Sequence, residues 1–162
     1  MLPGGPAWLT CIGVGYGAFL VAIAIYDVRR HRVPNVAVYP AIAIAIALAF
    51  VRPDGDWWSF LLAGLGAGAF FLALGSMDSA AMGGGDVKLA VLIGLMAGWP
   101  GVVVAVFVAF AVGATVGLAL ISLGRLGRRD PLPFAPALAV GAVTAAVTGH
   151  QVAALLWPGL AA

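Results

Sequence analysis

Asp27 and Asp86 each lie where an apolar run meets a loop. A carboxylate at the edge of a membrane helix is costly unless it faces protein or water, so such acids are functional by default. Two carboxylates brought together cannot both ionise cheaply, and one then keeps its proton where a free aspartate would lose it. The pair would supply an acid and a base, which is the chemistry of water attack on a peptide carbonyl.

Three glycines, Gly83, Gly84 and Gly85, directly precede Asp86. Without Cβ atoms they allow another backbone to approach closely, and they permit a positive φ just before the next helix begins. We therefore expect an extended substrate to lie against them. The other four acids fall in predicted loops, where solvated charge is the ordinary interpretation. They are Asp54, Asp56, Asp78 and Asp130.

The composition is that of an integral membrane protein: 64% of the residues are hydrophobic, 9% are charged and the mean hydropathy is +1.13. The formal net charge of +2 is too small to favour a nucleic-acid partner. The one cysteine, Cys11, excludes an internal disulfide and a cysteine zinc site. No histidine and acid cluster has metal-ligand spacing, so we expect neither a metal nor a cofactor.

Six apolar runs of helical length predict an all-α, polytopic membrane protein with about six transmembrane helices in a single domain, residues 1–162. The charged residues fall almost entirely in the short breaks between the runs. The predicted helices are 7–26, 36–51, 57–74, 87–98, 102–123 and 134–156.

The basic residues predict the orientation. The first, third and fifth loops hold all of them except Arg52, so that side should be cytoplasmic and both termini should lie outside. The seven are Arg29, Arg30, Arg32, Lys88, Arg125, Arg128 and Arg129. Two helices separate Asp27 from Asp86, and an even number of crossings returns the chain to the same side. The fourth run, about 12 residues long, is too short to cross the hydrocarbon, which places Asp86 below the surface.

From the residues alone, three kinds of function remain open. The two acids could form a peptidase site or a proton relay in a small proton-coupled transporter, or they could simply pair with Arg29 and Lys88. A non-catalytic assembly subunit is the third alternative. Replacement of each acid by asparagine separates these functions, because it removes the ionisable group and keeps the size.

Three segments resemble conserved parts of the prepilin peptidases, the type IV leader peptidase family of Gly-x-Gly-Asp aspartic membrane proteases. Residues 26–35 (Tyr-Asp-Val-Arg-Arg-His-Arg-Val-Pro-Asn) are similar to the first catalytic segment, and residues 83–89 (Gly-Gly-Gly-Asp-Val-Lys-Leu) to the second. Residues 132–136, which include Pro133 and Pro136, resemble the Pro-Phe-x-Pro segment that opens the last helix. The order and spacing of the three segments agree with the family.

The resemblance implies cleavage of the basic leader of prepilin or pseudopilin substrates at the cytoplasmic face of the bacterial cytoplasmic (inner) membrane. Asp27 and Asp86 carry over as the catalytic pair. Longer members have an additional cysteine-rich cytoplasmic segment associated with N-methylation, so with one cysteine we expect no methyltransferase activity here. The short form is most similar to the peptidases of tight-adherence (Flp-type) pilus systems.

Presenilins and signal peptide peptidases give a competing resemblance, through Tyr26-Asp27, the Gly83–Asp86 run and Pro136-Ala137-Leu138. Those proteases have more spans and carry their two acids on adjacent helices. Two predicted helices lie between the acids here, so the architecture favours the prepilin peptidases.

The residues around the acids receive structural roles first. Lys88 follows Asp86 by two positions, nearly opposite on a helix, which favours contact with substrate or extension to the interface over tuning of the acid. Arg29 is expected to anchor the loop to lipid headgroups. Pro34 restricts the residue before it, and Asn35 is predicted to cap the second helix.

The orientation is tested by cysteine labelling in a chain in which Cys11 is replaced by alanine. A cysteine at position 30 should react with a membrane-impermeant thiol reagent from the cytoplasmic side only, and one at position 55 from the outside only. The reverse pattern would remove the argument for a cytoplasmic site.

Overall fold

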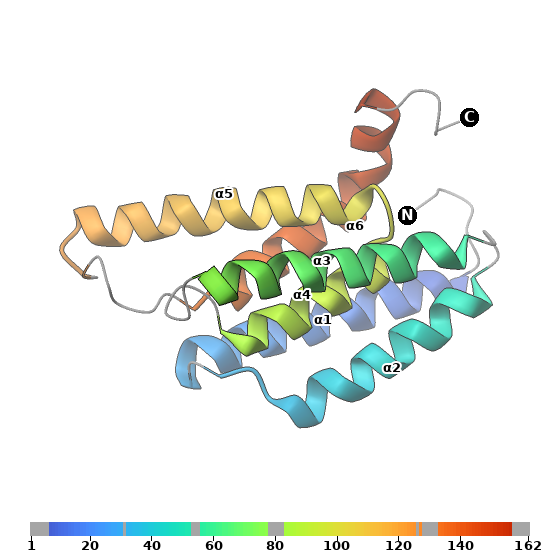
Figure 1. The fold of residues 1–162 in the computed structure, drawn as a ribbon, viewed down its shortest axis with the longest axis horizontal. Coiled ribbons are helices and arrows are strands. Elements are labelled where there is room, and N and C mark those ends of the chain that lie inside the picture. The colour runs from blue at the N-terminus through green and yellow to red at the C-terminus, as the bar shows by residue number, and fades with distance from the viewer. Residues whose placement is uncertain are drawn as a thin grey trace.

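The computed structural model describes residues 7–30, 32–52, 56–77, 83–125, 127 and 133–156, and these residues form helices and short connections, without strands (Figure 1). The six helices are α1 (Ala7–Arg30), α2 (Asn35–Val51), α3 (Trp57–Met77), α4 (Gly84–Ala97), α5 (Gly101–Ser122) and α6 (Ala135–Leu156). Several residues used in the sequence predictions lie outside the described residues. They are His31, Asp54, Gly55, Asp78, Arg128, Arg129, Asp130 and Leu132.

The prediction of six helices is confirmed, and the largest difference is at the end of α1. The apolar run ends at Tyr26, but the helix continues to Arg30. Arginine is a good helix former, and Arg29 and Arg30 in the last turn interact favourably with the helix dipole. Asp27 therefore lies within the last turns of α1, and its predicted place at a helix–loop junction was wrong.

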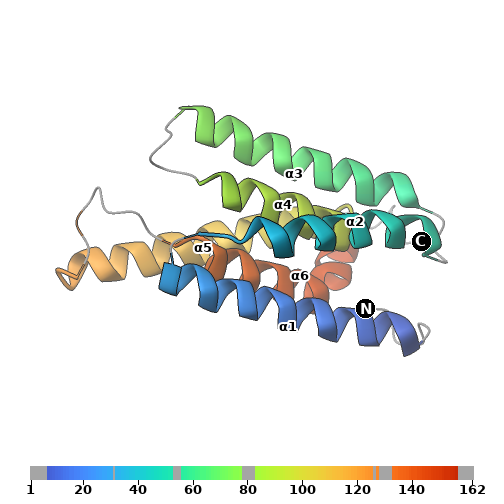
Figure 2. The same ribbon diagram turned by 90° about the horizontal axis from the view of Figure 1, so that it is seen from below.

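Helix α4 is the centre of the bundle and contacts α2, α3, α5 and α6 (Figures 1 and 2). Six of the seven residues from Leu89 to Leu95, all except Val91, are buried, as expected of a helix that is apolar all round. By contrast, α1 packs mainly on α6. The last turn of α1 and the first turn of α4 lie at the same end of the bundle, whereas α1 starts and α6 ends toward the other end (Figure 1).

Helices α3 and α4 approach each other through glycine. A Cβ atom added at Gly94 would overlap the carbonyl group of Ala63, and one at Gly64 would lie 2.7 Å from Cγ of Leu95. At Gly68 the added Cβ would lie 2.5 Å from Cγ2 of Val91. Gly64 and Gly68 lie four residues apart on α3 and thus allow the close helix packing that small residues permit in lipid.

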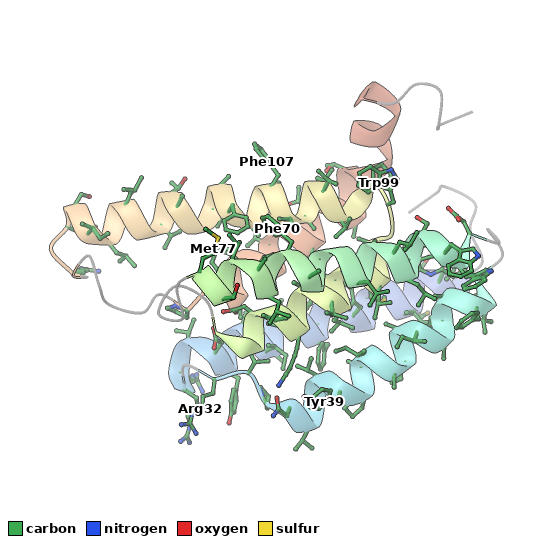
Figure 3. All side chains as sticks on the ribbon, viewed as in Figure 1. Arg32, Tyr39, Phe70, Met77, Trp99 and Phe107 are labelled. Carbon is green, nitrogen blue, oxygen red and sulfur yellow. The ribbon has the colours of Figure 1, made fainter. Side chains whose placement is uncertain are left out.

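Three helices, α1, α3 and α5, are long and apolar enough to cross a membrane by length and composition. Helix α2 and residues 135–148 of α6 are shorter apolar helices. Helix α4 has 14 residues, which at ~1.5 Å per residue gives about 21 Å, less than the hydrocarbon thickness. Large apolar side chains such as Phe107 on α5 point away from the bundle (Figure 3). The chain is therefore a multi-pass membrane protein with a short, buried central helix.

The close contact between α3 and α4 predicts different effects of alanine at two glycines. Gly94→Ala would force backbone movement against Ala63 and should destabilise the protein by about 1–3 kcal/mol. Gly66→Ala, which meets nothing within 4 Å, is the matched control and should unfold at or above the wild-type temperature. The measurement is thermal unfolding in detergent followed by tryptophan fluorescence. Equal midpoints for the two variants would contradict the packing described here.

Candidate active site

Asp27 lies on the inward face of α1. Leu20 and Ile23, which precede it by seven and four residues, are also buried, so the three side chains form one helical stripe. Asp27 is only 6% exposed and is the buried charged residue of the described core. A carboxylate in that position requires polar surroundings, since burial of an isolated charge is very costly.

Asp86 lies in the first turn of α4. The N-cap is Gly83, whose backbone amide donates to Oδ2 of Asp86 at 3.3 Å, while the amide of Asp86 donates to the Gly83 carbonyl at 3.0 Å. The partial positive charge of a helix N-terminus favours a carboxylate there. The side chain is half-buried, so one of its faces remains open to substrate or water.

The two acids interact electrostatically. Asp86 precedes the apolar body of α4, outside the three membrane-length helices, and its pKa is raised from 3.8 to about 6. Burial is the largest cause, the negative charge of Asp27 is the second, and the hydrogen bond from Gly83 acts in the opposite direction. Asp27 and Asp86 therefore lie close enough to interact, at the end of the bundle where α1 ends and α4 begins, as the parity of helix crossings predicted.

The glycines before Asp86 have a different role from the predicted one. Gly83 is extended, with φ −77° and ψ 147°, and Gly84 and Gly85 already belong to α4, so the predicted positive φ was wrong. A Cβ atom at Gly85 would lie 2.7 Å from Cγ2 of Val33, whereas one at Gly84 would meet nothing within 4 Å. Gly85 therefore allows the segment before α2 to touch the first turn of α4, and Gly83, where a Cβ atom would lie 3.4 Å from Oδ2 of Asp86, leaves space over the carboxylate.

Lys88 joins the two segments that surround the acids. Its Nζ donates to Oδ1 of Asn35 at 2.7 Å and lies 4.9 Å from the centre of the Tyr39 ring. Pro34, and not Asn35, is the N-cap of α2, and its carbonyl accepts from the amides of Ala37 and Val38. The predicted capping role of Asn35 was wrong because its side chain is used by Lys88.

The remaining predicted residues lie at the edge of this site. Arg29 and Arg32 are exposed, and Figure 3 shows Arg32 at the end of the bundle where α2 begins, not far from Tyr39. A shallow apolar groove of about 250 Å³ lies between the last turns of α1 and Pro136 of α6. Arg29 is one of the residues that line it. Pro133 precedes α6 and is half-buried. Pro136 of the third predicted segment thus borders the helix that carries Asp27.

Sequence reasoning did not identify Val33 and Tyr39 as parts of the site. The signal for Tyr39 was present, because residues four apart on a helix share a face and Asn35 is four residues before it. Among the described residues, no three His, Cys, Asp or Glu side chains gather where a metal ion could bind.

The fold and the site together define a helical membrane protein with two interacting acids at one end of its bundle. The chain matches the model of the type IV leader peptidase family over residues 14–118, a range that includes Asp27 and Asp86, and it belongs to this family. The Pro133–Pro136 segment lies beyond the matched range.

Curated relatives carry the name prepilin leader peptidase/N-methyltransferase. The one from Bacillus subtilis is 34% identical over 83% of this chain and 54% of its own length. The proteins from Burkholderia pseudomallei and Aeromonas hydrophila are 30% and 28% identical, over 85% and 91% of this chain. The chain spans about half the length of the curated relatives it matches. None of the solved structures matches it with comparable significance.

The raised pKa of Asp86 predicts how stability depends on pH. Because folding raises this pKa from 3.8 to about 6, the folded state binds more protons than the unfolded state between these values, and stability falls as pH rises through them. Asp86→Asn should therefore raise the unfolding temperature at about pH 7.5 and leave it nearly unchanged at about pH 4.5. Asp56→Asn, at an exposed acid, is the control. A gain of the same size at both pH values would contradict the assignment.

Proposed function

We propose that this chain is an aspartic endopeptidase that removes the short basic leader of type IV prepilin-like proteins at the cytoplasmic face of the bacterial inner membrane, with Flp-type prepilins as its first candidate substrates. The observation that carries the proposal is the electrostatic interaction of Asp27 with Asp86 in a member of the type IV leader peptidase family. Membership in this family supports peptide cleavage and lends no support to proton-coupled transport.

In the proposed reaction the two acids act as one titrating pair. The ionised member takes a proton from water as the water oxygen bonds to the scissile carbonyl carbon, and the protonated member gives its proton to the carbonyl oxygen. When the tetrahedral intermediate collapses, the carbon–nitrogen bond breaks. The acid that took the proton from water gives it to the leaving nitrogen. A hydroxyl group of the intermediate gives its proton to the other acid, so the pair again holds one proton.

The surroundings of Asp86 support an extended substrate. Gly83 is exposed, and a Cβ atom added there would lie 3.4 Å from Oδ2 of Asp86, so the lack of a side chain at Gly83 leaves space over the half-buried carboxylate. A peptide bond is reached by a carboxylate only when its backbone comes close, and glycine permits that approach. The short α4 keeps Asp86 near the level at which a leader would meet a hydrophobic substrate helix.

The proposal covers the leader-peptidase reaction and not N-methylation, although the relatives' name includes both. Both candidate catalytic acids fall within the matched residues. These 162 residues contain one cysteine, Cys11, and therefore supply no paired cysteines of the kind associated with methylation in longer members.

The test is co-expression with prepilins from the same genome, followed by mass spectrometry of the pilin N-terminus. Wild type should remove the leader just before the hydrophobic segment, whereas Asp27→Asn and Asp86→Asn should each slow cleavage by about 10²–10⁴-fold, because each loses a proton-transfer group. The same spectra report any added methyl group.

Asp56→Asn serves as the control, because it removes an exposed carboxylate and should cleave at the wild-type rate. Folded wild-type protein that leaves every neighbouring prepilin intact would contradict the proposed function. Cleavage by both Asp27→Asn and Asp86→Asn at the wild-type rate would leave a peptidase but refute the acid pair.

A further inference from the structure

The geometry points to Lys88 as a positioning residue that holds Asp86 opposite Asp27 by fastening the start of α2 to the start of α4, an inference that rests on the proposed function. Lys88 meets α2 at two points one turn apart, since Asn35 accepts its hydrogen bond and the Tyr39 ring lies under its ammonium group. We call this arrangement the Lys88 clasp. Charged donors form the stronger hydrogen bonds, and the aromatic face adds attraction.

Contacts with the start of α2 and the residues before it occur on both sides of Asp86 in the sequence of α4. The residue before Asp86 is Gly85, which packs on Val33, and two residues after it is Lys88, which bonds Asn35. Val33 lies in the connection from α1 to α2, and Asn35, two positions later, is the first residue of α2. The first turn of α4 is therefore held against one short piece of chain on both sides of the acid.

The same piece of chain leads directly to Asp27. Only seven residues separate Asp27 from Asn35, so the position of the clasp limits where the end of α1 can lie. Helix packing also limits this distance, because α1 and α4 both pack on α6. The connection that Lys88 fastens adds a second restraint, which acts next to the two acids.

Direct action of Lys88 on Asp86 fits the structure less well. The causes of the raised pKa of Asp86 are burial, Asp27 and the bond from Gly83, and the ammonium group is turned toward Asn35 and Tyr39. The ammonium group of Lys88 is held on α2 by Asn35 and the Tyr39 ring, whereas an anchoring lysine would direct it to the aqueous interface.

The experiment measures kcat and KM for prepilin cleavage by Lys88→Met, Asn35→Leu and the double variant. Each single change should lower kcat by about 10- to 100-fold at nearly constant KM, because a small displacement of catalytic groups has effects of this size. The double variant should be no slower than either single one, since both remove the same contact. Asn35→Asp, which keeps the acceptor, should retain most activity, and Arg125→Met, at an exposed cation, is the matched control.

Hydrogen exchange gives a readout that does not need catalysis. The amides of Ala37 and Val38, which bond to the Pro34 carbonyl, should exchange faster in Lys88→Met and Asn35→Leu than in wild type or Arg125→Met. Unchanged exchange, additive losses of kcat, or a rise in KM in Lys88→Met alone would each overturn the inference, the last by showing a substrate contact. If wild type cleaves no prepilin while exchange changes as expected, the clasp stands and the peptidase assignment fails.

Discussion

The placement of two carboxylates, Asp27 and Asp86, near each other at the end of an apolar bundle is the constraint on which the rest of the structure depends. Two carboxylates at the end of an apolar bundle separate unless the backbone holds them, because each prefers water and neither favours the other's charge. Most of the fold supplies this restraint. Helix α4 is buried on nearly every face, and its contacts with four other helices fix the acid at its first turn.

Glycine and small residues make this restraint possible. Where α3 meets α4, Gly64 and Gly94 bring the helices so close that side chains would collide. Gly85 does the same where α4 meets the segment that precedes α2. Lipid provides no hydrophobic driving force between helices, so close van der Waals packing has to stabilise such an arrangement. The close packing of the helices therefore offsets the cost of holding the two acids together.

Much of this arrangement could be predicted from the sequence, since apolar length gives the six helices and the parity of crossings places both acids at one end. The errors have local causes. Asp27 was placed at a junction because hydrophobicity, which ends at Tyr26, does not report that arginines continue a helix. The side chain of Asn35 was predicted to cap α2. The sequence does not show that Lys88, 53 residues later, donates to the same side chain.

Helix α2 is fastened to α4 at its far end as well, where Arg52 Nη2 donates to the carbonyl of Met96 at 3.1 Å and its guanidinium lies 4.0 Å from the centre of the Phe60 ring. Met96 follows Arg52 by 44 residues, so during synthesis this arginine is made well before its partner exists. While α2 is being inserted, the Met96 carbonyl has not yet been made, and the arginines after α1 must outweigh the charge of Arg52 as a signal for orientation. Because α1 is made before α2, the strongest signal for orientation should come first, and the arginines that end α1 are in that place.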